Sequence, residues 1–160
     1  MRTTVIAGNP KPASRTLTAG IDVATALTGT APDDVIDVVT LGAGLLGWGD
    51  PGVAAAVSTV KRSDLIVVAS PTFKATYTGV LKLFLDQFET STGLTGVTAV
   101  PLMLGAAPGH AMAPEVYLRP LLGELGATTP APGLYLIDAT AADPESYLPW
   151  IERWRGAILG

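Results

Sequence analysis

Residues 3–16 read TTVIAGNPKPASRT: a short apolar run, a loop of small residues, and then the start of a helical stretch. Residues 3–7 combine threonine, valine and isoleucine without polar alternation, which is typical of a strand buried on both faces. The loop leads directly from this strand into a helix. We therefore expect the chain to begin with a strand of a parallel sheet that is covered by helices.

The rest of the chain repeats this alternation. Further strands are predicted at residues 65–69 and 97–102, which are mainly apolar, and weaker ones at 35–39 and 134–137. Helical spacing is found over residues 16–27, 53–62, 79–88, 114–125 and 145–159. Five strands alternating with five helices predict an α/β fold with helices on both faces of a parallel sheet. No repeat or long linker divides the chain, so residues 1–160 are expected to form one domain.

The composition narrows the classes of function. Charged residues make up only 15% of the 160 residues, so a second subunit or a ligand is expected to cover part of the surface. The absence of cysteine excludes disulfides, thiolate metal sites and a cysteine nucleophile. A net charge of -4 argues against non-specific binding of nucleic acid. No signal peptide and no membrane span are recognisable, so we expect a cytoplasmic protein.

The segment 79–88 is unusual because its apolar residues spread around most of a helix. Only Lys82 and Asp86 form a polar stripe. An apolar surface that wide indicates burial on two sides. A subunit interface and an unusually deep helix both explain it.

The first loop, residues 8–16, places small residues, hydroxyl groups and two cations at the start of a helix. Free N–H groups and the helix dipole favour an anion there, so the loop is a candidate phosphate site. Alternatively, Ser14 or Thr16 is an ordinary N-cap, and Lys11 and Arg15 are merely solvated. The loop contains neither a Walker motif nor a Gly-x-Gly-x-x-Gly fingerprint, which argues against ATP-driven chemistry.

Two further loops follow the strands at 65–69 and 97–102. Residues 70–79 offer hydrogen-bonding groups beside Phe73 and Tyr77, which suits a planar heterocycle, although both rings could belong to the core. Residues 104–110 are mostly small and include the only histidine, His110. No carboxylate or serine elbow accompanies it, so a surface position is the simpler interpretation.

Together these loops resemble the NADPH-dependent FMN reductase family, especially the flavin reductases of alkanesulfonate assimilation. The resemblance is carried by residues 8–10 with 14–16, by SPTFKATYTGVLK at 70–82 followed by Leu85 and Asp86, and by Gly105 with His110. It implies a flavodoxin-like three-layer α/β/α fold, with a five-stranded parallel sheet in the order 2-1-3-4-5. The chain departs from the family pattern at Phe73, where tyrosine is usual, and at Ala106, where glycine is usual.

The resemblance also implies an FMN site. Its phosphate would contact Ser14, Arg15 and Thr16, and backbone groups of Gly105 and Ala106 would meet the flavin ring. The full set of expected cofactor-binding residues is Gly8, Pro10, Ser14, Arg15, Thr16, Pro71, Thr72, Phe73, Lys74, Gly105, Ala106 and His110, of which those from Pro71 to Lys74 would line the ribityl chain and ring. No metal site is expected.

The implied reaction is hydride transfer from NADPH or NADH to the flavin N5, with no catalytic side chain. The resemblance further implies a homodimer or homotetramer formed through the helix at 79–88, and a flavin-dependent monooxygenase that receives the reduced FMN. An enzyme that retains FMN and reduces a quinone, an azo dye or a metal ion is the alternative.

Other classes with this architecture fit less well. A flavodoxin-like electron carrier is expected to have acidic flavin loops, whereas these loops contain Lys11, Arg15 and Lys74. A receiver domain needs acidic residues after the first strand and at the end of the third, but Gly8, Asn9 and Ser70 occupy those positions. A related phosphatase needs a cysteine nucleophile.

Overall fold

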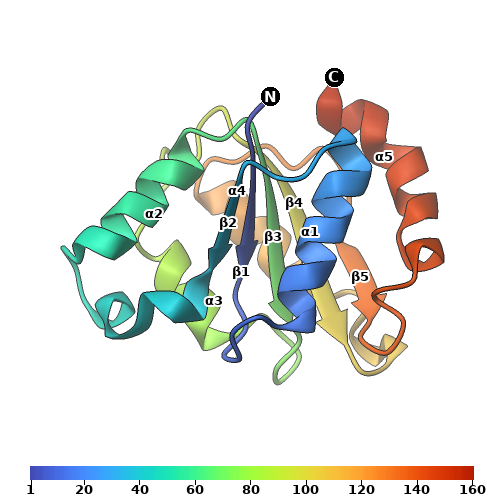
Figure 1. Cartoon of the computed structure of the whole chain (residues 1–160), viewed down its shortest axis with the longest axis horizontal. Coiled ribbons are helices and arrows are strands. Elements are labelled where there is room, and N and C mark those ends of the chain that lie inside the picture. The colour runs from blue at the N-terminus through green and yellow to red at the C-terminus, as the bar shows by residue number, and fades with distance from the viewer.

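A five-stranded parallel sheet forms the centre of the computed structural model, which describes residues 1–160 (Figure 1). The sheet order is β2-β1-β3-β4-β5. The strands are β1 (Thr3–Ala7), β2 (Asp34–Asp37), β3 (Leu65–Pro71), β4 (Thr98–Gly105) and β5 (Leu134–Ile137). Every neighbouring pair is parallel. The expected sheet and its order are therefore confirmed.

Helices cover both faces of the sheet. In Figure 1, α1 (Arg15–Thr28) and α5 (Leu148–Leu159) lie on one face, while α2 (Pro51–Lys61), α3 (Gly79–Leu85) and α4 (Arg119–Glu124) lie on the other. Alternate strand residues enter separate cores: Val5 joins the core beneath α1 and α5, and Ile6 joins the core beneath the other three helices. All five residues of β1 are buried, because both faces of the strand are covered. The expected three-layer arrangement is confirmed.

Two helical segments differ from their expected limits. The helix at 79–88 ends as α3 at Leu85, and residues 86–88 continue as a turn. Leu81, Phe84 and Leu85 are buried within the chain, whereas Leu83 is 36% exposed. Packing within one subunit thus explains most of the apolar surface that the sequence pattern revealed.

The segment at 114–125 begins with a π-helical turn, Pro114–Leu118, before α4. Pro120 has no N–H to donate within the helix, which favours a locally altered hydrogen-bond pattern. Glu115 ties this turn to the chain ahead of β5, since its Oε2 accepts a 2.8 Å hydrogen bond from the Gly133 N–H. Burial opposes ionisation of Glu115, but this bond and the pair with Arg119 outweigh it and hold the pKa of Glu115 below its usual value.

The strands also differ from their expected limits: β2 spans Asp34–Asp37 instead of residues 35–39, and β3 and β4 continue past their expected ends to Pro71 and Gly105. The chain leaves the sheet after Asp37 and enters short 3-10 turns over Val38–Leu46, with a kink at Gly42. Val38 is buried in the core although it lies outside the strand. Its apolar side chain therefore reflects core packing and does not mark a continuation of β2.

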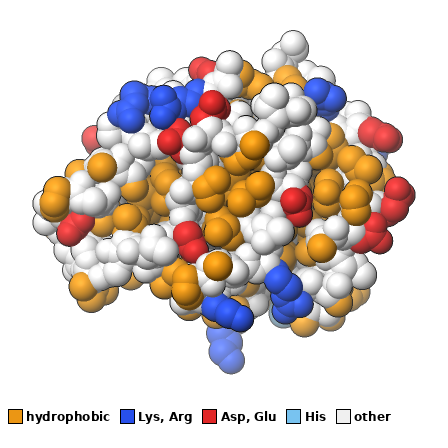
Figure 2. All heavy atoms as spheres, in the orientation of Figure 1, with side chains coloured by type: hydrophobic (Ala, Val, Ile, Leu, Met, Phe, Trp, Pro, Cys, Tyr) orange, Lys and Arg blue, Asp and Glu red, His pale blue; other side chains and the backbone are white.

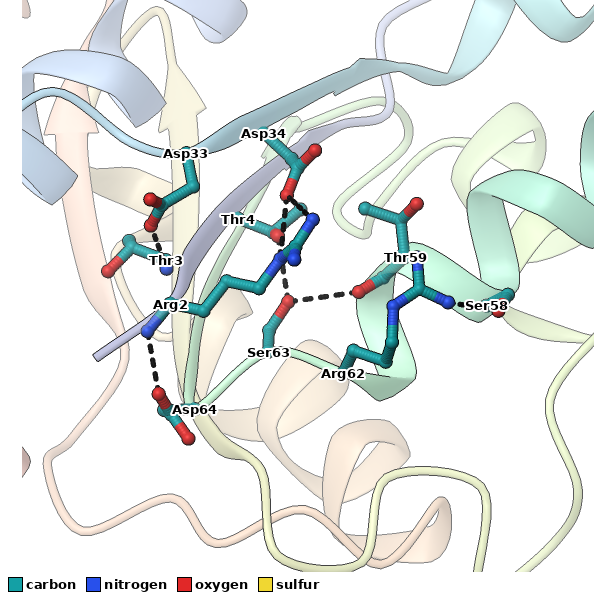
Figure 3. A network of polar contacts seen from close by, with 10 residues as sticks. All are labelled: Arg2, Thr3, Thr4, Asp33, Asp34, Ser58, Thr59, Arg62, Ser63 and Asp64. Carbon is teal, nitrogen blue, oxygen red and sulfur yellow. Dashed lines mark hydrogen bonds and ion pairs between the residues drawn. The ribbon is translucent and has the colours of Figure 1, made fainter.

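A polar network closes the amino ends of the strands (Figure 3). The Arg2 side chain donates to Asp34 Oδ2 from both Nε and Nη2, and the buried hydroxyls of Thr4 and Ser63 lie 2.7 Å apart. Asp64 Oδ2 accepts a 2.6 Å bond from the Arg2 N–H. These groups satisfy one another, and the loops that follow the strands lie at the opposite, carboxyl end of the sheet (Figure 1).

None of the helices combines the length and the apolar composition that a membrane span requires.

Candidate functional site

A cavity of about 380 Å³ opens at the carboxyl ends of β1, β3, β4 and β5. It lies where the sheet order reverses between β1 and β3, which is the usual ligand position in such folds. Its lining consists of Asn9, Lys11, Ala13, Ser14, Arg15, Thr16, Pro71, Thr72, Phe73, Leu104, Gly105, Ala106 and Asp138. The fold therefore brings together the three loops that the sequence singled out.

Most of the expected cofactor-binding residues line this cavity: Ser14, Arg15, Thr16, Pro71, Thr72, Phe73, Gly105 and Ala106. Gly8, Pro10, Lys74 and His110 do not line it. Gly8 is buried beneath the first loop, whereas His110 lies beside a separate groove.

The first loop is held in shape by its own polar groups. Ser14 Oγ accepts a 3.3 Å bond from the Leu17 N–H and thus caps α1. Thr16 Oγ1 accepts a 3.0 Å bond from Asn9 Nδ2. Ala13 has a φ of 49°, and its N–H donates to Asp37 Oδ2 at 2.8 Å. Hydrogen bonds within the chain therefore define the shape of this loop.

Two donors at the start of α1 remain unused. The backbone N–H groups of Arg15 and Thr16 have no hydrogen-bond partner in the chain. Because the first N–H groups of a helix carry a partial positive charge, they favour an anion in the cavity that both residues line. The capping role of Ser14 and an anion site are thus compatible.

The charges in the cavity come from Lys11, Arg15 and Asp138. Arg15 Nη2 lies 2.5 Å from Asp138 Oδ2, and the Arg15 side chain is 73% exposed. Figure 2 shows Lys and Arg side chains projecting from the lower edge of the molecule, toward which the strands point in Figure 1. This edge is therefore suited to an anion, although Asp138 offsets one of its positive charges.

The second loop forms a tight hairpin. The Phe73 N–H donates to Thr76 O at 2.8 Å, and the Thr76 N–H returns a 3.2 Å bond to Phe73 O. Lys74 and Ala75, at the tip, have φ values of 52° and 70°, which non-glycine residues seldom adopt. The hairpin leaves Phe73 half exposed at the cavity and Lys74 outside its lining.

Thr78 joins the second loop to the first. Its Oγ1 donates to Gly8 O at 2.6 Å and accepts from the Leu81 N–H at 3.2 Å, and its N–H donates to Ser70 Oγ at 3.1 Å. The side chain is buried, so these bonds are sheltered from water. Thr78 thus fixes the distance between the two loops.

The third loop is shaped by Tyr135. Its hydroxyl donates to Ala107 O at 2.8 Å, and its ring lies against Gly105. A Cβ on Gly105 would collide with the Tyr135 hydroxyl and come within 2.8 Å of Cζ. The resemblance implied contacts between the Gly105 backbone and the flavin ring, and a side chain at this position would also displace the Tyr135 hydroxyl.

His110 lies beside a separate groove of about 190 Å³ together with Ala75, Met112, Val116 and Tyr117. No carboxylate lines this groove. The histidine therefore has neither a position in the main cavity nor a partner that would orient it for proton transfer.

The family model for "NADPH-dependent FMN reductase" matches residues 1–142 of the chain. The chain belongs to the NADPH-dependent FMN reductase family. This membership confirms the family that the loop motifs indicated. It also agrees with the flavodoxin-like sheet order described above.

Curated members of the family share moderate identity with this chain. The "FMN reductase (NADPH)" of Escherichia coli (strain K12) is 27% identical over 155 residues, covering 89% of this chain and 76% of that protein. The "NADH-dependent FMN reductase SfnF" of Pseudomonas fluorescens (strain Pf0-1) is 31% identical over 94 residues, covering 57% and 48%. The match to the second relative thus spans about half its length.

Solved structures of the same fold agree. An NADH:FMN oxidoreductase (EMOB) has a TM-score of 0.84 and 25% identity, with 98% of this chain and 89% of that chain covered. An oxidoreductase from Corynebacterium diphtheriae has a TM-score of 0.79 and 23% identity, with 99% and 97% covered. This FMN reductase family member therefore shares its fold with these two structures over nearly its whole length.

Five lining residues are absent from the predicted cofactor-binding set: Asn9, Lys11, Ala13, Leu104 and Asp138. Asn9 supports Thr16, and Asp138 pairs with Arg15. Asp138 directly follows β5, one of the two weaker expected strands, and the sequence pattern drew no attention to the loop after it. The rule that ligands meet the carboxyl ends of parallel strands would have indicated it.

Proposed function

We propose that this chain reduces FMN with NADPH or NADH, and that FMN binds in the 380 Å³ cavity. The observation that carries this proposal is the convergence of unused N–H donors, two cations and an exposed aromatic ring in one cavity of a family member. The names of its relatives, which include both NADPH- and NADH-dependent FMN reductases, support the reaction.

The phosphate of FMN fits the amino end of α1. The free N–H groups of Arg15 and Thr16, the Arg15 guanidinium and the Lys11 ammonium supply donors and positive charge there. Ser14 Oγ accepts the Leu17 N–H and so caps α1, while its O–H remains free to donate to the phosphate.

The ribityl chain and ring fit the other end of the cavity. Thr72 Oγ1 is buried and has no hydrogen-bond partner in the chain, which suits a ligand hydroxyl. Phe73 is 50% exposed and offers an apolar face, while Gly105 and Ala106 present backbone. The second and third loops thus suit a planar ring at the end of the cavity that lies away from Arg15.

Bound FMN would supply the acceptor for the hydride that the reduced nicotinamide donates. The residues of the cavity bind and orient it: Arg15 and Thr16 hold the phosphate end, and Phe73 limits the position of the ring. No side chain is assigned to proton transfer, because the only histidine lies outside this cavity.

The proposal is tested by adding FMN, FAD or riboflavin to the purified chain and following NADPH and NADH oxidation at their absorbance band. Flavin-dependent consumption of either nicotinamide is expected. If no flavin binds and neither nicotinamide is consumed, the proposed function is wrong. Filtration of the turnover mixture would separate FMN that the chain releases from FMN that stays bound. Released FMN would favour transfer to a monooxygenase, and bound FMN would favour another electron acceptor.

Tyr135→Phe is expected to weaken FMN binding about 2- to 10-fold, because one hydrogen bond that steadies the ring loop is lost. The phenylalanine ring still fits against Gly105, so the unfolding temperature should change little. Fluorescence titration of FMN gives the affinity, and Tyr117→Phe, on the exposed groove, is the control. Unchanged affinity in Tyr135→Phe would show that the loop is held by other contacts.

We further propose that the chain forms a homodimer or homotetramer through the 79–88 region. Leu83 is the exposed leucine of α3, and Leu46 and Trp48 beside it are 77% and 76% exposed. Adjacent exposed apolar side chains are typical of interaction surfaces. The cytoplasmic location that we expect from the sequence also remains a prediction.

Leu83→Asp should therefore dissociate the subunits, since a carboxylate cannot be buried without a partner. Light scattering would report a mass near that of one chain. Val35→Asp, which changes an exposed residue of the edge strand β2, should keep the wild-type mass. An unchanged mass in Leu83→Asp would place any interface elsewhere.

A further inference from the structure

Asp138 lies between the two ends of the cavity. Its Oδ2 is 2.5 Å from Arg15 Nη2, and its backbone N–H donates to Gly105 O at 2.9 Å. The carboxylate therefore shares the cavity with the cation that faces the phosphate end, while its backbone is anchored to the loop at the ring end.

The charges of the lining do not match a phosphate dianion. Lys11 and Arg15 contribute two positive charges, and Asp138 contributes one negative charge, so the lining carries a net charge of +1. A phosphomonoester carries about −1.5 to −2 charges at neutral pH. A second carboxylate, Asp37, lies behind the loop, where it accepts the Ala13 N–H. Without Asp138 the lining would balance the phosphate.

We propose that Asp138 competes with the FMN phosphate for Arg15 and so keeps FMN an exchangeable ligand. This inference rests on the proposed function, because it takes FMN as the occupant of the cavity. Asp138 acts on the phosphate end only, so it also reduces the preference for FMN over riboflavin, which lacks the phosphate.

The Arg15–Asp138 pair is suited to such an exchange. The two side chains are 73% and 34% exposed, and ion pairs this open to water add little to the stability of a fold. An incoming phosphate can therefore displace Asp138 at little cost. Once displaced, the carboxylate still repels the phosphate across the same cavity, because their charges have the same sign.

Asp138→Asn removes the negative charge with almost no change in shape. We expect FMN affinity to rise on the order of 5- to 10-fold, while riboflavin affinity stays the same. Fluorescence titrations of both flavins, at low and at high salt, measure this, and the gain should shrink at high salt. Glu152→Gln, an exposed change on α5, controls for the altered net charge.

Combining Asp138→Asn with Arg15→Ala tests whether Asp138 acts through Arg15. The gain in FMN affinity should be clearly smaller in the Arg15→Ala background, because the competition is then absent. If Asp138→Asn weakens FMN, Asp138 orients Arg15 and the inference is wrong. Unchanged FMN affinity, or an equal change for riboflavin, overturns it as well.

Asp138→Ser is a second variant in case the asparagine side chain perturbs the fold, and circular dichroism melting shows whether either variant is intact. Failure of this inference is distinct from failure of the proposed function. If the unaltered chain binds neither flavin, the function is wrong; if it binds both and Asp138→Asn leaves their ratio unchanged, only the role of Asp138 is wrong.

Discussion

Gly8→Ala is expected to destabilise the fold by about 1–3 kcal/mol and to abolish FMN binding. The new methyl group would overlap the Leu81 side chain and lie 3.0 Å from Leu81 Cα, so α3 itself must shift. Gly8 also donates to Ala69 O and accepts from Thr78 Oγ1. The shift therefore reaches both the first and the second loop of the cavity. Urea unfolding and FMN titration measure the two effects.

Gly79→Ala is the matched control, because it alters the first residue of the same helix and its Cβ would meet nothing within 4 Å. Its stability and FMN affinity should stay close to those of the unaltered chain. If Gly8→Ala is as stable and binds FMN as well as Gly79→Ala does, the contact between β1 and α3 does not shape the cavity.

Arg15→Ala is expected to weaken FMN binding about 10- to 100-fold, because hydrogen bonds to charged groups are worth about 1.5–3 kcal/mol each. Riboflavin has no phosphate, so its affinity should not change. Titration of both flavins by fluorescence quenching gives the ratio.

Arg155→Ala removes the same charge from an exposed position of α5 that does not line the cavity. Both flavins should bind this variant as they bind the unaltered chain. An equal loss of FMN and riboflavin in Arg15→Ala would contradict the placement of the phosphate at the start of α1.

Much of the fold could be predicted because a strand that is buried on both faces is recognisable by its apolar composition. In β1, Val5 enters one core and Ile6 the other, so neither position tolerates a polar side chain and the strand reads as a continuous apolar run. The limits of α3 were harder to predict, since Phe88 is apolar and buried although the helix ends at Leu85.

The candidate phosphate site at the start of α1 could also be located in the sequence, because its groups lie close together in the chain. Ser14, Arg15 and Thr16 are consecutive, and the start of α1 brings their backbone and side chains to the same place. Lys74 shows the limit of this reasoning. Its position in the second loop predicted a place along the ribityl chain and ring, but the hairpin carries it to a tip outside the cavity lining.

The sequence by itself determined the parallel sheet, its helices and the loop at the start of α1, because these depend on local periodicity and on residues that are neighbours in the chain. Only the tertiary structure brought Asp138 to Arg15 and Tyr135 to Gly105. The reason is that β5 reaches the cavity through the sheet order, so residues far apart in the chain meet by strand pairing, which no local pattern records.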